Sequence, residues 1–219
     1  HPPRRGTHQR QLQFQLELSC EPAAAAEGDA HPLRPMPTRR LFVSLPVPAS
    51  VRAEFAKLVT RLPDVRWLPD EQWHVTMRFL GNVDDARVDE ICDRLAAIRV
   101  EPFLLPTEGV GAFPAKGHPR VLWVGTGNGH PRLHQLRQRL DDALLAAGID
   151  FDLRTFHPHI TLARCGEDAR VPVAQWLRHH AKFEGPPFRV DAFELMESEL
   201  RPAGAHYSLV KRFELSKPA

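Results

Sequence analysis

Two short stretches of the sequence each contain a histidine and a threonine separated by one residue. The first stretch has His74 and Thr76, and the second has His159 and Thr161, at a spacing of 85 residues. In a β-strand, side chains two positions apart point to the same face, so each stretch presents one imidazole and one hydroxyl together. The residue after each histidine and after each threonine is apolar, which predicts that the opposite face of each strand is buried.

Two imidazoles and two hydroxyls that share a space are suited to phosphoryl transfer without a metal ion. A neutral imidazole can take a proton from an attacking water while a protonated imidazole gives a proton to the leaving oxygen. The ordinary histidine pKa of about 6.5 allows both forms near neutral pH. The threonine hydroxyls can donate hydrogen bonds to the phosphate oxygens that carry charge. We therefore predict His74 and His159 as the acid–base pair, and Thr76 and Thr161 as phosphate-binding residues.

The elements around the two stretches follow from hydrophobic periodicity. Apolar residues recur at helical spacing in four segments, and short apolar or alternating runs mark the strands between them. Ser50 can cap the first helix, and Gly148 can end the third. The predicted helices cover residues 50–62, 88–98, 133–147 and 173–180, and the predicted strands cover residues 40–45, 73–80, 103–113, 120–125, 156–163, 188–197 and 205–213.

These elements repeat with the same 85-residue spacing as the two histidines. The first two helices match the third and fourth, Phe103 matches Phe188, and the strand at 121–124 matches residues 206–209. Agreement between the motifs and four flanking elements indicates an internal duplication. We predict an α+β fold of two pseudo-twofold lobes, with two antiparallel or mixed sheets and helices outside. The two motifs would then face each other in a central cleft.

The residues that flank each motif support a comparison with a known family. HVTMRFLG, from His74 to Gly81, and FHPHITLAR, from Phe156 to Arg164, resemble the paired signatures of the two-histidine phosphoesterases. RLFVSLPVP and LMESELRPAGAHYSLVKRFEL also resemble segments of that family, and the resemblance spans about residues 39–215. Within the family, the sequence is similar to the bacterial and archaeal RNA 2′,3′-cyclic phosphodiesterases, historically called 2′-5′ RNA ligases.

The resemblance implies a single bilobal phosphoesterase domain over residues 39–219. It also implies hydrolysis of a terminal 2′,3′-cyclic phosphate to a 2′-phosphate, with His74 as the acid toward the O3′ leaving atom and His159 as the base toward water. Arg164 stands where the family has an arginine that contacts phosphate. The expected substrates are RNA ends or short oligonucleotides with a 2′,3′-cyclic phosphate, and we expect a monomer that uses no cofactor.

Two residues beside the first motif are further candidates for substrate contact. Strict strand alternation turns Arg78 to the same side as Thr76, where it can reach substrate or solvent. Phe79 can stack on a terminal base, although packing in the core fits this side chain equally well. Met77 stands where the family usually has leucine, which should affect packing only.

Several other interpretations of the same residues stay open. His157 and His159 are two positions apart and could chelate a metal, but no nearby cysteine or carboxylate completes a ligand set, so no metal site is predicted. The cleft could instead act on small nucleotide cyclic phosphates or 2′-5′ oligonucleotides, or could join RNA ends as a 2′-5′ RNA ligase. A non-catalytic RNA-end binder is the remaining alternative, and it is disfavoured because a binder needs no second titrating histidine.

The composition excludes some classes of protein. The 219 residues carry a formal net charge of +2, which is too small for a protein that wraps a long nucleic-acid duplex. The three cysteines are far apart, which argues against a disulfide framework or structural zinc and favours the cytoplasm. Cys165, close to the second motif, is interpreted as a buried thiol rather than a nucleophile. No apolar run approaches the ~20 residues of a membrane span, so no membrane association is expected.

The first part of the chain differs from the rest. Residues 1–38 contain several prolines, a run of four alanines and only one short patch of alternating apolar residues. Such a segment buries little apolar surface, so we predict a mobile N-terminal extension. Met36 precedes the first convincing strand, and we expect the folded part of the protein to begin there.

Overall fold

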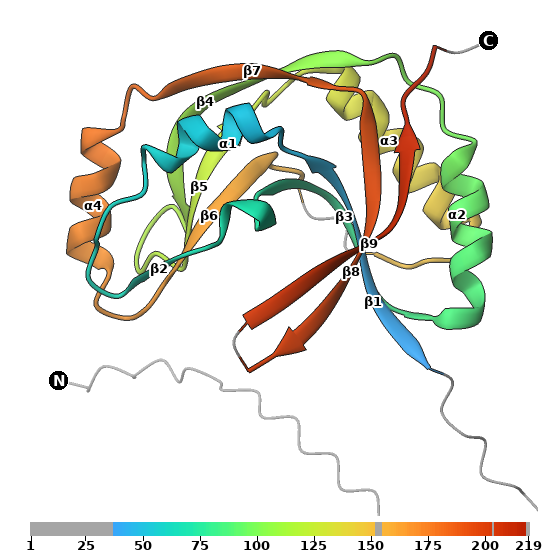
Figure 1. The fold of residues 1–219 in the computed structure, drawn as a ribbon, viewed down its shortest axis with the longest axis horizontal. Helices are drawn as coiled ribbons and strands as arrows, with labels where there is room; N and C mark the ends of the chain where they lie inside the picture. Colours follow the sequence, from blue (N-terminus) through green and yellow to red (C-terminus); the bar gives the residue numbers. More distant parts are fainter. Residues whose placement is uncertain (1–36, 152–154, 203, 218–219) are drawn as a thin grey trace, which may run out of the picture. The chain divides into compact units, whose positions relative to one another are not determined.

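An antiparallel sheet forms the centre of the computed structural model, which describes residues 37–151, 155–202 and 204–217. Within these ranges, nine strands form the sheet and four α-helices flank it (Figure 1). All the strand pairs run antiparallel, and the predicted α+β class is confirmed. The strands are β1 (Thr38–Pro46), β2 (Val65–Trp67), β3 (His74–Asp84), β4 (Phe103–Phe113), β5 (Val121–Thr126), β6 (His159–Cys165), β7 (Glu184–Val190), β8 (Ala192–Arg201) and β9 (Gly204–Glu214), and the helices are α1 (Ala49–Ala56), α2 (Val88–Ala96), α3 (Pro131–Ala146) and α4 (Arg170–His179).

The order of the strands reflects the predicted duplication. The sheet reads β7-β4-β5-β6-β3-β1-β8-β9, with β2 paired to β6, so the two motif strands, β6 and β3, lie at its middle. These two strands pair at a single position, where Val75 is opposite Ile160. The two predicted sheets are thus the halves of one sheet, and they join at a narrow seam between the motifs.

Strand pairing corrects one part of the predicted repeat. The 85-residue spacing matches β5 with β9. In the sheet, however, β5 lies beside the motif strand β6 in the same way as β1 lies beside the motif strand β3, so the counterpart of β5 is β1. Ser44 in β1 is opposite Thr76, and Trp123 in β5 is opposite Thr161. Thr76 follows Ser44 by 32 positions, whereas Thr161 follows Trp123 by 38. Because the second connection is longer, no single spacing aligns both strands of each half.

The helices and the sheet pack around a hydrophobic core. The apolar undersides of both motif strands, including Val75 and Ile160, are fully buried in it. The helical stripes expected from the sequence also face this core, which confirms their periodicity. The buried residues of the two stripes are Val88, Ile91 and Leu95 in α2, and Leu133, Leu136, Leu140 and Leu144 in α3.

Two predicted elements differ in extent from the observed ones. The helix predicted over residues 50–62 ends at Ala56. Leu58 and Leu62 still pack in the core, but they reach it from a turn and from an irregular segment. Their spacing imitates that of a continuing helix. The strand predicted over residues 188–197 is two strands, which separate at Asp191, where the chain leaves its pairing with β4 and begins to pair with β9.

The predicted N-terminal extension lies almost entirely outside the described residues. β1 begins at Thr38, which agrees with a strand at this point in the sequence. The extension over residues 1–38 and the domain boundary at residue 39 therefore stay predictions.

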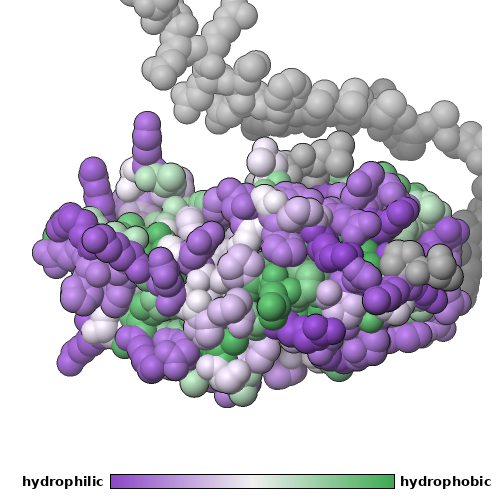
Figure 2. All heavy atoms as spheres, turned by 90° about the horizontal axis from the view of Figure 1, so that it is seen from above, coloured by the Kyte–Doolittle hydropathy of each residue, from purple (hydrophilic) through white to green (hydrophobic). Residues whose placement is uncertain are grey.

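The face of the molecule shown in Figure 2 is mostly hydrophilic. In the view of Figure 2, hydrophobic residues form small patches that hydrophilic residues separate. None of the helices in the described part of the chain is both long enough and apolar enough to cross a membrane.

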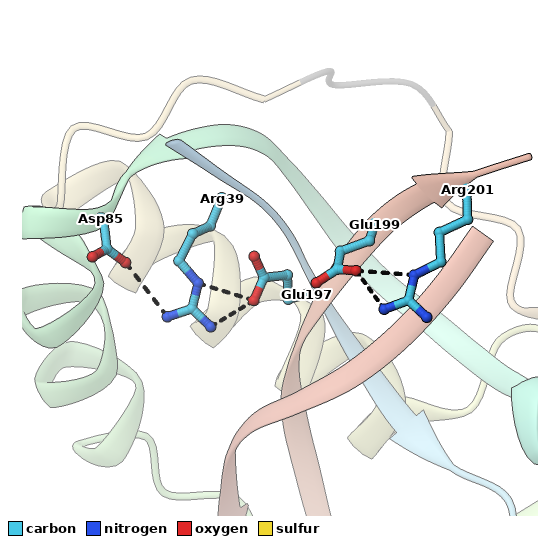
Figure 3. A network of polar contacts seen from close by, with 5 residues as sticks. All are labelled: Arg39, Asp85, Glu197, Glu199 and Arg201. Atoms are coloured by element: carbon cyan, nitrogen blue, oxygen red, sulfur yellow. Dashed lines mark hydrogen bonds and ion pairs between the residues drawn. The ribbon is translucent and has the colours of Figure 1, made fainter. Parts of the chain in front are cut away.

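The hairpin of β8 and β9 is tied to β1 by an arginine. Arg39 donates Nε and Nη2 to the same oxygen of Glu197, at 3.0 and 2.7 Å, and its Nη1 lies 3.6 Å from Asp85 (Figure 3). The hydrogen bonds to Glu197 raise the pKa of Arg39 above its ordinary value. Further along β8, Glu199 accepts two hydrogen bonds from Arg201. The pair with Glu197 connects β1 to β8, and the pair with Asp85 connects β1 to the turn that follows β3.

Candidate active site

A β-bulge in each motif strand decides which side chains face the cleft. In β3, Arg78 is opposite Val43 and Thr76 is opposite Ser44, so Met77 is an extra residue. In β6, Ala163 is opposite Leu122 and Thr161 is opposite Trp123, so Leu162 is the extra residue. A bulge shifts the alternation of side chains by one position. Phe79 and Arg164, each three residues after a motif threonine, therefore share the face of that threonine.

Arg78 does not share the face of Thr76, although strict alternation predicts it. The bulge turns Arg78 toward α3, where its side chain is 7% exposed. Its Nε donates to Oδ1 of Asp141 at 2.8 Å, and its Nη2 donates to Oδ2 at 2.5 Å. The guanidinium also lies over the ring of Phe151, 4.1 Å from the centroid. Arg78 thus connects β3 to α3 and does not line the cleft that contains the two histidines.

A cleft of about 550 Å³ brings the two motifs together. It is lined by side chains from both halves of the sheet and by the tip of the β8–β9 hairpin. Positive charge comes from Arg40 and Arg164, and no carboxylate among the described residues lines it. This charge distribution favours an anionic ligand. The predicted site residues that line the cleft are His74, Thr76, Phe79, His159, Thr161 and Arg164.

His74 is held in one orientation by its own backbone. Its Nδ1 lies 2.7 Å from the carbonyl oxygen of Gln72. Because a carbonyl oxygen only accepts hydrogen bonds, Nδ1 carries the proton, and Nε2 is left for a ligand. The ring packs between Phe42 and Tyr207, at centroid distances of 5.1 and 5.4 Å. Burial lowers the pKa of His74 to about 4, although the hydrogen bond to Gln72 acts in the opposite direction.

His159 has the same arrangement in the second half. Its Nδ1 lies 2.7 Å from the carbonyl oxygen of His157, so Nε2 is again left for a ligand. Phe113 and Trp123 flank the ring, at centroid distances of 4.9 and 6.2 Å. Burial lowers the pKa of His159, and the nearby charges of His157 and Arg164 lower it further. Both imidazoles are therefore mainly neutral near pH 7 when no anion is bound.

The aromatic walls and the backbone acceptors of the site are absent from the sequence-based candidates. Phe42, Phe113 and Tyr207 all line the cleft and contact a motif histidine. Tyr207 lies in the C-terminal segment that resembles the family, so this resemblance could have indicated Tyr207 as a site residue. The carbonyl acceptors leave no signal in the sequence because every residue has one.

The described residues offer the site neither a cluster of metal ligands nor a reactive thiol. In the described ranges, no group of three or more His, Cys, Asp or Glu side chains could hold a metal ion. Cys165 is a buried free thiol, and its burial raises its pKa, which disfavours the nucleophilic thiolate. This agrees with the interpretation of Cys165 from the sequence.

Two related halves that each bring an imidazole and a hydroxyl to one cleft have the organisation of a two-histidine phosphoesterase. The family model of the LigT like phosphoesterases matches the chain twice, over residues 45–123 and 124–207. Each match contains one motif, which agrees with the predicted duplication. The chain belongs to the LigT-like phosphoesterase family.

Relatives of this chain have a common name. An RNA 2′,3′-cyclic phosphodiesterase of Aeropyrum pernix is 36% identical over 144 residues, which cover 65% of this chain and 82% of the relative. One of Thermus thermophilus is 33% identical over 187 residues, which cover 80% of this chain and 90% of the relative.

Solved structures have the same fold. The crystal structure of TT0787 of Thermus thermophilus is 30% identical in sequence and has a TM-score of 0.66, covering 82% of this chain and 100% of that one. The crystal structure of apo Escherichia coli LigT is 25% identical and has a TM-score of 0.68, covering 82% of this chain and 99% of that one.

Proposed function

We propose that this enzyme hydrolyses the terminal 2′,3′-cyclic phosphate of RNA to a 2′-phosphate, with His74 and His159 as the acid–base pair. One observation carries the proposal. Each histidine holds its Nδ1 against the carbonyl oxygen two residues earlier, so both Nε2 atoms are available to the same cleft. The relatives named RNA 2′,3′-cyclic phosphodiesterase support the same reaction.

In the proposed reaction, a water molecule attacks phosphorus on the side opposite O3′. His159 takes a proton from the water through Nε2, and His74 gives a proton to O3′ as the P–O3′ bond breaks. One P–O bond forms and one breaks, so the phosphate stays on O2′. Thr76, Thr161 and Arg164 donate hydrogen bonds to the non-bridging oxygens, where negative charge increases in the transition state.

The substrate itself generates the acid in this mechanism. Burial lowers the pKa of both histidines in the free enzyme, so neither carries much charge near pH 7. A phosphodiester anion between them favours the protonated form of an imidazole. Substrate binding is therefore coupled to the uptake of a proton, which resides on His74 in the proposed assignment. His159 stays neutral and able to act as the base.

Phe79 is proposed as the contact for the terminal base. Its side chain is 62% exposed although it is large and apolar, and it lines the cleft on the same face as Thr76. An exposed aromatic ring beside a phosphate site provides a surface on which a base can stack.

Hydrolysis of an RNA with a 2′,3′-cyclic phosphate end, in the presence of a chelator, tests the proposed function. We expect full activity and a 2′-phosphate product. Activity that disappears in chelator and returns with added divalent metal would contradict the metal-free mechanism. The same assay with cyclic mononucleotides, 2′-5′ dinucleotides and a 5′-hydroxyl acceptor distinguishes the alternative substrates and ligation.

We also propose that the enzyme is a monomer in the cytoplasm. Both motifs of the cleft come from one chain, so the reaction needs no residue from a second copy. Cys92 and Cys165, the cysteines within the described ranges, are free thiols, which suits a reducing compartment. Sedimentation of the purified chain tests the oligomeric state.

A further inference from the structure

A second cavity, of about 410 Å³, adjoins the cleft. Residues 77–79 of β3 and the segment 155–157 before β6 line it, where the two strands have separated beyond their one shared pair. Its volume is in the range of pockets that bind small ligands. The side chains that line both the cavity and the cleft are Thr76, Phe79, Phe113 and His159.

Two arginines, Arg78 and Arg137, bring positive charge to this cavity. Arg137 of α3 has a side chain only 12% exposed, and its guanidinium lies over the ring of Phe156, 4.6 Å from the centroid. Its Nε lies 3.3 Å from Oδ2 of Asp141, and the same oxygen accepts a hydrogen bond of 2.5 Å from Arg78. Because Asp141 is shared between two cations, it neutralises Arg137 only in part. Burial lowers the pKa of Arg137, so a second anion beside it would stabilise its charged form.

Aromatic rings form the rest of the lining. Phe79 stands between the cleft and the cavity with 62% of its side chain exposed, and Phe113 and Phe156 complete the apolar wall. No carboxylate in the described part of the chain lines the cavity. Aromatic faces next to a buried cation are the combination that binds single-stranded nucleic acid, through base stacking and contact with phosphate.

We propose that this cavity binds the nucleotide on the 5′ side of the one that carries the cyclic phosphate. The inference rests on the proposed function, because a cyclic phosphate at the 3′ end lets the RNA continue only in the 5′ direction. The base of this nucleotide stacks on Phe156, and Arg137 pairs with the phosphate that joins the two nucleotides. The enzyme is then selective for oligonucleotides over mononucleotides.

Two substrates with the same reacting end test the proposal. One is a nucleoside 2′,3′-cyclic phosphate, and the other is a dinucleotide that ends in the same cyclic nucleotide. We expect kcat/KM of the wild-type enzyme to be roughly tenfold higher for the dinucleotide, because only this substrate has both the phosphate that pairs with Arg137 and a second base that can stack. Arg137→Gln should remove most of this gain and keep the mononucleotide value within about twofold. The mononucleotide rate therefore also reports whether the variant is folded.

Arg139→Gln is the matched control, because Arg139 is an exposed arginine on the same helix and does not line the cavity. It removes the same charge and should retain the dinucleotide gain. An equal loss of the gain in both variants would overturn the proposal in favour of a long-range charge effect. A wild-type enzyme without preference for the dinucleotide, or an Arg137→Gln variant that loses both activities alike, would also overturn it. Failure to hydrolyse either substrate would instead refute the proposed function, and the inference with it.

Discussion

Acid is expected to destabilise the folded protein through His74. Burial against Phe42 and Tyr207 lowers the pKa of this histidine to about 4 in the folded chain, whereas its ordinary value is about 6.5. Between these values the unfolded chain binds a proton that the folded chain does not bind. A lowered histidine pKa therefore contributes stability that is complete above about pH 6.5 and is lost as the pH falls toward 4.

The two pKa values set the size of the effect. Between pH 7 and pH 5, the unfolded form of His74 becomes almost fully protonated, while the folded form stays mainly neutral. The free energy of unfolding then falls by about 2 kcal/mol from this residue alone. For a chain of this length, that change corresponds to a decrease in Tm of roughly 4–8 °C.

Denaturant unfolding of wild-type protein and of His74→Gln, each at pH 7 and pH 5, measures this contribution. Glutamine does not titrate, so the variant should lose about 2 kcal/mol less than the wild type over this interval. His159 and the other histidines are common to both proteins, so their contributions cancel. His179→Gln removes an exposed imidazole at the end of α4 and serves as the control. Equal losses in the wild type and in His74→Gln would refute the reasoning, because burial would then not determine this pKa.

Three further predictions concern catalysis and the ion pair behind the cleft. His74→Ala and His159→Ala should each lower kcat on a cyclic-phosphate oligonucleotide by at least ~100-fold while the far-ultraviolet circular dichroism is unchanged; a folded variant with wild-type turnover would remove that histidine from the mechanism. A substrate with sulfur in place of O3′ needs little acid catalysis, so it should restore much of the rate of His74→Ala and little of that of His159→Ala; the opposite pattern would exchange the two roles. Asp141→Ala should lower the free energy of unfolding by about 2 kcal/mol in urea, because it weakens the pairing of the buried Arg78; a loss below about 0.5 kcal/mol would show that α3 does not depend on this contact.

Local alternation was enough to predict that each histidine shares a face with its threonine. This holds for His74 with Thr76 and for His159 with Thr161, because the bulge in each strand comes after the threonine. The predicted duplication, and not alternation, indicated that both pairs line one cleft. A bulge, in contrast, depends on how a strand pairs with its neighbour. Alternation alone therefore predicted the wrong face for Arg78. Arg164 was predicted from the family resemblance and not from alternation.

The surroundings of the histidines depend on distant parts of the chain. Phe42 and Tyr207 pack on His74 from β1 and β9, and neither is near it in sequence. The lowered pKa follows from this enclosure, so no local pattern could indicate it. The equivalence of β1 and β5 was hidden for a related reason, since the connections that follow these strands differ in length.

Phe79 and Arg164 occupy equivalent positions in the two motif strands, and both face the cleft. A cleft with identical halves would bind a cyclic phosphate in two orientations related by a half-turn. The two complexes would be superimposable, so either histidine could act as the acid and neither would have a fixed role. A guanidinium on one side and a phenyl ring on the other make the energies of the two orientations unequal, and a difference of about 1.4 kcal/mol already gives a tenfold preference. In the proposed reaction, the separate roles of His74 and His159 thus depend on a departure from symmetry within a duplicated motif.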